Sequence, residues 1–231
     1  MKLLFEPVAP VIAPTTTGEG FPVRRLFCIG RNYEEHAKEM GMQADPEAPF
    51  FFTKWAETVV GDGATIAYPQ GTSNFHFEAE LVVAIGKPGR NIPREQALEH
   101  VWGYATGLDM TRRDLQAEAR SKQRPWDAGK NVEESSPLGL IHPVSSLGDA
   151  TKGAITLTVN GVEKQRGDLS QLITPVDRLI EFLSGLYKLE AGDLIYTGTP
   201  AGVGAVVPGD VMVVAIDGLT SLTITVGQPA E

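Results

Sequence analysis

The sequence predicts an α+β protein that is predominantly β, with many short strands and a few short helices. The chain has 25 glycines and 16 prolines among its 231 residues, a composition that favours tight turns between short elements over a helical bundle. Apolar runs of strand length recur along it, and Asn160-Gly161, a two-residue turn typical of hairpins, separates two of them. Residues 175–184 are the clearest helical exception, because apolar side chains recur there every three or four positions.

The first half of the chain mixes expected strands and helices. Strands are expected at residues 23–29, 49–55, 75–85 and 101–108, which are apolar or aromatic runs bounded by glycine, proline or polar residues. A helix is expected between Asn32 and Gly41, because Asn32 and Glu35 have the spacing of a capping box and Gly41 can end the helix. A short helix at 94–99 and a longer one at 110–122 follow.

The second half is richer in strands. They are expected at residues 138–142, 154–159, 162–166, 193–196, 211–216 and 219–226. The helix at 175–184 lies between them and is expected to cover the core. The strand at 193–196 leads into a glycine-rich turn that extends to Gly204.

Composition and charge restrict the size of the fold and the class of partner. With 42% hydrophobic residues the chain can bury one sizeable core. We therefore expect a catalytic domain at residues 22–231, preceded by an N-terminal extension at residues 1–21. The formal net charge of −9 argues against nucleic acid or an anionic membrane as partner, since both require basic patches. A small-molecule substrate is expected instead.

The sequence also predicts a cytoplasmic location. Prolines interrupt the apolar start of the chain, and no apolar stretch reaches the length that spans a bilayer. The single cysteine, Cys28, can form no internal disulfide. Its place in an apolar run favours a buried, inert thiol over a nucleophile.

The expected strand at residues 75–85 carries the first chemical signal. Side chains alternate between the faces of a strand, so His76, Glu78 and Glu80 share one face. Two ionised carboxylates this close repel each other and resist burial. Solvent or a hard divalent cation can compensate them.

Other candidate groups are individually ambiguous. His36 and Glu39 lie three residues apart and share a helix face, which by itself favours a solvated local pair. Asp109 lies where a strand is followed by a helix, a position typical of helix caps and of active-site groups. Lys54 is interpreted as structural or as lining a rim, and Lys130 follows a glycine in a loop, where lysines are normally exposed.

The glycine-rich turn offers a possible anion site. It lacks the Gly-Lys-Ser/Thr ending of a phosphate-binding loop. Its backbone N–H groups and the hydroxyls of Thr197 and Thr199 can bind a small carboxylate, and a plain turn fits this segment equally well.

Together these segments resemble the fumarylacetoacetate hydrolase family. The resemblance covers about residues 22–226 and keeps the order of the motifs. It is carried by Gly30-Arg31-Asn32-Tyr33 with His36 and Glu39, His76-x-Glu78-x-Glu80-Leu81, Gly107-Leu108-Asp109-Met110-Thr111, Gly129-Lys130 and the segment from Gly192 to Gly204. The sequences of residues 50–54 and 109–116 are most similar to those of the short acylpyruvate hydrolases, especially the fumarylpyruvate hydrolases of gentisate breakdown.

The resemblance implies a mixed β-sandwich roll with short helices that works as a homodimer. It implies one divalent cation per chain, Mg²⁺ or Mn²⁺ with Ca²⁺ as a substitute, bound by Glu78, Glu80 and Asp109. By the same resemblance the catalytic residues are His36, Glu39 and Lys130. The substrate-binding residues that it implies are Arg31, Gln116, Thr197, Gly198 and Thr199.

The implied activity is metal-dependent hydrolysis of a carbon–carbon bond in an acylpyruvate, which is a 2,4-diketo acid. Fumarylpyruvate, cleaved to fumarate and pyruvate in the catabolism of gentisate, is the first expectation. The alternative within the family is an oxaloacetate decarboxylase or an isomerase and decarboxylase of a related 2-keto acid. A metal-stabilised β domain without turnover ranks behind both, because structural metal sites are usually closed and need no neighbouring base.

Overall fold

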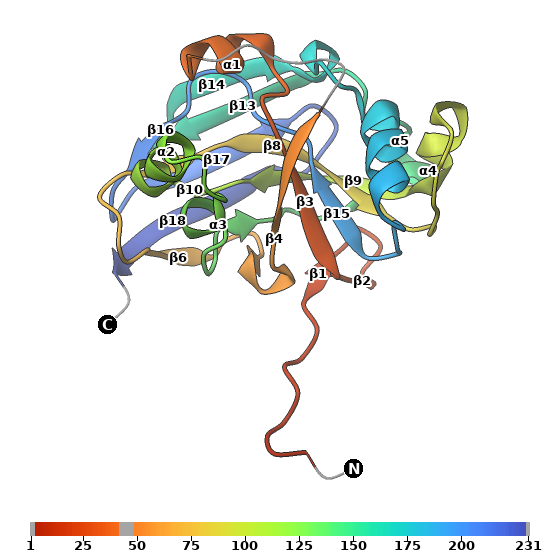
Figure 1. Cartoon of the computed structure of the whole chain (residues 1–231), viewed down its shortest axis with the longest axis horizontal. Coiled ribbons are helices and arrows are strands. Elements are labelled where there is room, and N and C mark those ends of the chain that lie inside the picture. Colours follow the sequence, from red (N-terminus) through yellow and green to blue (C-terminus); the bar gives the residue numbers. More distant parts are fainter. Residues whose placement is uncertain (1–2, 42–48, 230–231) are drawn as a thin grey trace.

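Two sheets face each other across the main apolar core (Figure 1), in a computed structural model that describes residues 3–41 and 49–229. The larger sheet has the strand order β12 (His142–Pro143), β9 (Val101–Leu108), β8 (Ala79–Ile85), β15 (Asp193–Tyr196), β3 (Arg25–Gly30) and β4 (Phe50–Lys54). The second has the order β14 (Val162–Asp168), β13 (Ala154–Val159), β17 (Val211–Ile216), β18 (Leu222–Pro229) and β6 (Thr65–Tyr68). The predominantly β, α+β class is confirmed.

Small sheets and short helices complete the fold. The three-stranded sheet has the order β10 (Thr111–Arg112), β7 (Phe75–Phe77) and β16 (Gly204–Val206), and the pairs are β1 (Ile12–Pro14) with β2 (Gly20–Pro22) and β11 (Ser136–Pro137) with β5 (Val59–Val60). The α-helices are α1 (Glu34–Glu39), α2 (Arg113–Ser121), α3 (Asp127–Lys130), α4 (Val144–Leu147) and α5 (Val176–Leu186). The 3₁₀ helices are η1 (Ala56–Thr58), η2 (Arg94–His100) and η3 (Leu169–Gln171).

Strand β8 is buried on both faces, which explains its near-continuous apolar sequence. Leu81 and Val83 belong to the core between the two main sheets, to which α5 contributes Leu179 and Leu183. Val82, on the other face, belongs to a second apolar cluster beneath the β1–β2 hairpin. Glu80 shares the face of Val82, so burial of this strand forces a carboxylate into the interior.

The expected strand at residues 75–85 is interrupted at Glu78. Strand β7 pairs with β10 and β16, whereas β8 pairs with β9 and β15, so the chain changes sheets between them. At the crossing the carbonyl of Glu78 accepts a hydrogen bond from the backbone N–H of Asp109 at 2.9 Å. The interruption therefore brings two predicted carboxylates side by side.

The predicted capping box of the first helix is wrong. Helix α1 begins at Glu34, and Tyr33 at its N-cap makes no side-chain cap. The Asn32 side chain is used elsewhere, since its amide donates to the carbonyls of Thr174 and Thr197. Gly41 does follow the helix, in the left-handed conformation with φ 67°.

Three other predicted elements are also corrected. The helix expected at 110–122 begins only at Arg113, because Thr111 and Arg112 pair with β7. The expected strand at 138–142 is replaced by the two-residue strands β11 and β12 on either side. The short helix expected at 94–99 is the 3₁₀ helix η2. The Asn160-Gly161 hairpin is confirmed, and both turn residues have positive φ, 52° and 76°.

The N-terminal segment has two parts. Residues 3–10 extend away from the sheets (Figure 1), and Leu4 and Phe5 there are exposed. The β1–β2 hairpin instead packs on the second apolar cluster through Ala13 and Phe21, which are buried. None of the helices in the described part of the chain has the length and apolarity needed to span a bilayer.

Candidate active site

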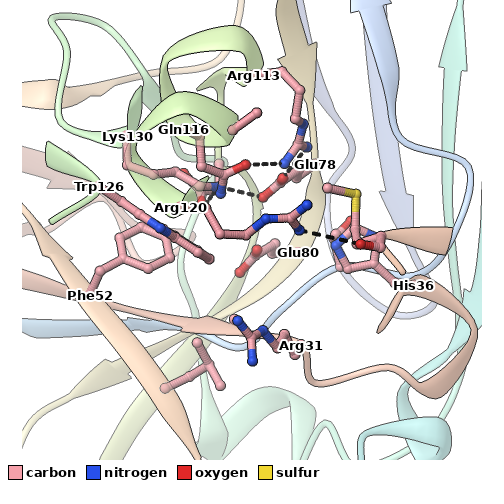
Figure 2. A pocket seen from close by; sticks show the side chains of 16 residues that line it. Arg31, His36, Phe52, Glu78, Glu80, Arg113, Gln116, Arg120, Trp126 and Lys130 are labelled. Atoms are coloured by element: carbon pink, nitrogen blue, oxygen red, sulfur yellow. Dashed lines mark hydrogen bonds and ion pairs between the residues drawn. The ribbon is translucent and has the colours of Figure 1, made fainter. Parts of the chain in front are cut away.

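A pocket lies where β3, β8 and β9 meet the helices α1, α2 and α3. Its lining includes three buried carboxylates, Glu78, Glu80 and Asp109. Figure 2 shows side chains from several elements pointing into it, with Arg113 and Gln116 on one side and His36 on another.

The three carboxylates converge because of strand register. Glu80 lies on β8 opposite Gly107 of β9, and Asp109 follows the end of β9. Ligand oxygens of Glu78, Glu80 and Asp109 all lie within 4.8 Å of one another. The residues are only 5%, 1% and 1% exposed, so solvent does not compensate their charges.

Buried cations surround two of these carboxylates. The Lys130 ammonium donates to Glu78 Oε2 and to Asp109 Oδ2, both at 2.6 Å. Arg113 donates to Glu78 Oε1 at 2.5 Å, and Lys54 donates to Asp109 Oδ1 at 2.9 Å. Glu80 Oε2 accepts instead from the backbone N–H of Gly198 at 2.8 Å.

This arrangement shifts the pKa values of the two glutamates in opposite directions. Burial raises the pKa of Glu80 well above its usual range, and the nearby carboxylates of Asp109 and Glu78 raise it further. Burial also acts to raise the pKa of Glu78, but the charges of Lys130 and Arg113 outweigh it and hold that pKa well below the usual range. Glu80 is thus the carboxyl whose charge most needs a further cation.

The donor set fits a hard divalent cation. Carboxylate oxygens are the ligands that Mg²⁺, Mn²⁺ and Ca²⁺ prefer, and here three of them converge in a buried place next to an open pocket. A cation there would offset the repulsion that Glu80 experiences from its neighbours. The three residues can therefore hold such an ion.

His36 and Glu39 lie on α1 at the side of the pocket. The Nδ1 atom of His36 is 3.2 Å from Glu39 Oε2, and the histidine is buried. The Glu39 side chain is 34% exposed, and its carboxylate accepts from the backbone N–H of Gly202 at 3.2 Å. The pair is therefore fixed against the glycine-rich turn, and His36, unlike an ordinary residue of a solvated helix face, lines the pocket.

Helices α2 and α3 present the predicted residues Gln116 and Lys130. A Cβ atom at Gly129 would lie 2.8 Å from the backbone nitrogen of Gln116, so only glycine allows the two helices to approach this closely. This contact places Lys130 in the interior rather than in solvent, where a loop lysine is normally found. Gln116 Oε1 accepts from Arg113 at 2.6 Å.

The glycine-rich turn contributes one side chain to the pocket lining. Thr199 lines the pocket and its hydroxyl accepts from Gln165 at 2.8 Å. The Thr197 hydroxyl donates to the carbonyl of Leu81 at 3.0 Å, and Thr197 is not among the described residues that line the pocket. Gly198, at φ +98°, directs its N–H to Glu80.

Lys54, Arg113 and Arg120 were not anticipated at this site. The sequence predicts a structural or rim-lining role for Lys54, and in the structure its side chain is buried against Asp109 and the carbonyl of Ser135. Arg113 lies three residues before Gln116, so helical spacing from that predicted residue could have identified it. Cys28 is buried as expected, and burial raises its pKa.

The family model for the fumarylacetoacetate (FAA) hydrolase C-terminal domain matches residues 25–227. The chain belongs to the fumarylacetoacetate hydrolase family. Within this family, a fumarylpyruvate hydrolase from Ralstonia sp. is 52% identical over 194 residues, which are 83% of this chain and 100% of that protein. A mitochondrial oxaloacetate decarboxylase from Dictyostelium discoideum is 41% identical over 197 residues, covering 85% and 90%.

A solved structure of the same fumarylacetoacetate hydrolase family is also similar over nearly the whole chain. Fumarylpyruvate hydrolase from Pseudomonas aeruginosa, in complex with Mn²⁺ and pyruvate, superposes with a TM-score of 0.94 at 50% identity, covering 98% of this chain and 100% of that one. The predicted family and the prediction of a hydrolase-type enzyme are confirmed. The Mn²⁺ in that structure and the buried acidic triad here both support a divalent cation.

Proposed function

We propose that this chain hydrolyses a carbon–carbon bond in an acylpyruvate, with fumarylpyruvate as the substrate and fumarate and pyruvate as the products. The observation that carries the proposal is one pocket lined by a buried acidic triad, a buried lysine and His36, which is paired with Glu39. The identity of 50–52% to fumarylpyruvate hydrolases supports this substrate class.

Glu78, Glu80 and Asp109 would hold one divalent cation, Mg²⁺ or Mn²⁺, with Ca²⁺ as a substitute. When bound, the ion supplies a Lewis acid that polarises the keto and carboxylate oxygens of the pyruvyl half. The protein supplies the rest of the chemistry from the pocket wall. Arg31, Gln116 and Thr199 are the wall residues assigned to substrate binding, while Thr197 and Gly198 hold the turn that carries Thr199.

His36 would remove a proton from water. Glu39, 3.2 Å from Nδ1, orients the imidazole and stabilises its protonated form, which leaves Nε2 as the atom that takes the proton. The water oxygen then forms a bond to the carbonyl carbon of the acyl group. The bond from that carbon to the pyruvyl methylene breaks, and the electron pair leaves with the pyruvyl half as an enolate. Protonation of the enolate at its methylene carbon gives pyruvate.

Lys130 would stabilise the charge that develops on this enolate. Its ammonium is buried between Glu78 and Asp109, where a fixed positive charge acts in a water-poor environment. Burial lowers the pKa of Lys130, but the neighbouring carboxylates of Asp109 and Glu78 outweigh this and raise it. Lys130 therefore remains charged at neutral pH and acts as an electrostatic group rather than as a base.

Oxaloacetate decarboxylation is a second candidate, favoured by the 41% identity to the Dictyostelium discoideum enzyme. Loss of carbon dioxide also produces an enolate, so it needs the acidic triad and Lys130 but no activated water. His36 and Glu39 are the residues that distinguish the two reactions. The position of His36 in the pocket lining, with Glu39 paired to it, favours hydrolysis.

The test is turnover of fumarylpyruvate and acetylpyruvate, followed by loss of enol absorbance and by release of pyruvate, with Mg²⁺ or Mn²⁺ and with EDTA. Metal-dependent pyruvate release supports the hydrolase. Loss of carbon dioxide from oxaloacetate without pyruvate release from either acylpyruvate supports the second candidate. We also propose that the protein is a cytoplasmic homodimer and that it serves gentisate catabolism. Sedimentation equilibrium tests whether it is a dimer.

A further inference from the structure

Two arginines lie on the pocket wall. Arg31 is assigned above to substrate binding without a partner group on the substrate, and Arg120 has no role in the chemistry described so far. Arg31 follows strand β3, and Arg120 is in the last turn of α2. Figure 2 shows both guanidinium groups directed into the pocket that contains Glu80 and His36. Their positions therefore call for a separate explanation.

Arg31 is held in an unfavourable backbone conformation. Its φ of 62° is left-handed, a region that side chains other than Gly, Asn and Asp rarely occupy. The neighbouring Asn32 maintains it, because the Asn32 side chain is anchored to the backbone of Thr174 and Thr197. Such strain is typical of sites where a side chain must point in one direction.

The Arg31 side chain is also preorganised with unused hydrogen-bonding capacity. Its guanidinium lies over the Phe50 ring, 5.3 Å from the centroid, which orients it. The Nε atom is buried and has no hydrogen-bond partner among the residues that the structure describes. A buried donor without a partner is costly, so a ligand that accepts from it would bind favourably.

Arg120 reaches the pocket from helix α2, a different element from the one that carries Arg31. One of its terminal nitrogens donates to the Met40 carbonyl at 3.3 Å, which draws the side chain across from α2 toward the end of α1. Ala117, one turn earlier on the same helix, also lines the pocket, and its small side chain leaves room beside the arginine. The guanidinium can therefore reach a ligand that extends outward from the triad.

Charge balance around the triad indicates that Arg31 serves the substrate. Glu78 and Asp109 are already paired with Lys130, Arg113 and Lys54, and Glu80 is the carboxyl that a divalent cation would compensate. The triad carboxylates therefore do not use the Arg31 guanidinium, whose Nε has no acceptor among the described residues. Guanidinium groups match carboxylates in shape and bind them through paired hydrogen bonds.

We propose that Arg31 and Arg120 form a second anion site, which binds the carboxylate at the far end of a dicarboxylic acylpyruvate. The inference rests on the proposed function, which places the pyruvyl carboxylate at the triad. The aromatic rings of Phe52 and Trp126, also on the wall, flank a flat unsaturated chain between the two ends. The site thus selects an acyl group such as fumaryl over acetyl, which carries no second charge.

The test compares Arg31→Asn and Arg120→Gln with wild type and with Lys122→Gln. Asparagine tolerates the left-handed conformation at position 31, so that variant keeps the backbone. Lys122 is an exposed control near Arg120 that pairs with Glu118 outside the pocket. The ratio of kcat/KM for fumarylpyruvate to that for acetylpyruvate is expected to fall about 10-fold or more in each arginine variant, mainly through KM. Lys122→Gln is expected to keep the wild-type ratio.

Calorimetry with fumarate and crotonate gives a measurement that needs no turnover, since crotonate replaces one carboxylate of fumarate by a methyl group. Wild type is expected to bind fumarate more tightly, and Arg31→Asn and Arg120→Gln are expected to lose that preference. In one outcome, wild type cleaves acylpyruvates while both variants keep the wild-type kcat/KM ratio and the preference for fumarate. That result would overturn the proposed anion site and leave the proposed function standing. If no acylpyruvate is cleaved, the proposed function fails, and the fumarate preference alone decides the anion site.

Discussion

The ammonium of Lys54 lies 2.9 Å from Oδ1 of Asp109, and both side chains are almost completely buried. On its other oxygen, Asp109 accepts from Lys130 at 2.6 Å. The carboxylate is thus held between two ammonium groups, and neither lysine can regain its hydration if the carboxylate is lost. Removing one member of a buried ionic cluster is usually far more costly than replacing all of it.

Asp109→Ala is therefore expected to destabilise the metal-free protein strongly. It leaves Lys54 without its carboxylate and Lys130 with Glu78 alone. The free energy of unfolding should fall by about 3–5 kcal/mol. Urea denaturation in the presence of EDTA measures this, and a loss below about 1 kcal/mol would show that water reaches the lysines.

Glu80→Gln is expected to have the opposite effect on the metal-free protein. The raised pKa of Glu80, caused by burial and by Asp109 and Glu78, means that its ionised form costs stability at neutral pH. A neutral amide whose oxygen still accepts from Gly198 removes that cost, so the metal-free Tm should rise by at least about 2 °C. Thermal denaturation with EDTA checks it.

The same variant should lose stabilisation by metal. For wild type, Mn²⁺ at 100 times its Kd is expected to add about 2.7 kcal/mol to the free energy of unfolding. Glu80→Gln should show little of this gain. A variant that is both destabilised without metal and fully stabilised by Mn²⁺ would remove Glu80 from the set of ligands.

Local sequence patterns predicted the elements whose pairing is itself local. Strand β9 and the hairpin around Asn160-Gly161 follow from apolar runs and turn chemistry. The predictions that fail concern residues whose contacts lie far away in the sequence. Glu78 interrupts a strand because β7 and β8 join different sheets, and Asn32 does not cap its helix because its amide reaches Thr174, 142 residues away.

The candidate site was partly visible in the sequence for a related reason. Glu78 and Glu80 were conspicuous because carboxylates are rare inside an apolar strand. Lys54 and Arg113 were not conspicuous, because a lysine or arginine at the end of a strand or helix is usually exposed to solvent. The sequence around it does not reveal a buried carboxylate partner. Those partners lie 55 and 35 residues away in the chain.

His36→Gln is expected to separate hydrolysis from metal binding. His36 does not belong to the cluster of carboxylate oxygens, so stabilisation by Mn²⁺ should persist, while hydrolysis of fumarylpyruvate should slow by about 10²–10⁴-fold. Decarboxylation of oxaloacetate, if wild type has that activity, should continue because it needs no activated water. Lys38→Gln, an exposed change on the same helix, serves as the control. Loss of metal stabilisation in His36→Gln would overturn this separation.

Asp114→Asn should reduce stability in a pH-dependent way. Burial acts to raise the pKa of Asp114, but hydrogen bonds from Thr72, Ser73 and Leu115 outweigh it and lower that pKa. A lowered folded-state pKa stabilises the protein above the unfolded value of about 3.9 and ceases to do so as pH falls through the folded value. Because the carboxylate is only half-buried and water competes for it, the loss at pH 7 should be about 1 kcal/mol. Chemical denaturation should show the two proteins converging in acid, and a constant difference down to pH 2 would contradict the assignment.

Arg31→Asn is expected to make the protein more stable while making it a poorer enzyme for dicarboxylic substrates. The left-handed backbone at Arg31 costs about 1–2 kcal/mol for an ordinary side chain and much less for asparagine. Loss of the contact between the guanidinium and the Phe50 ring removes about 0.5–1 kcal/mol of that gain. The free energy of unfolding should therefore rise by up to about 1 kcal/mol in urea denaturation. Arg31→Lys, which keeps both a cation and the strain, should show no such rise. If Arg31→Asn is instead less stable than wild type, the left-handed conformation carries no strain, and the argument that Arg31 is held there for its function loses its energetic support.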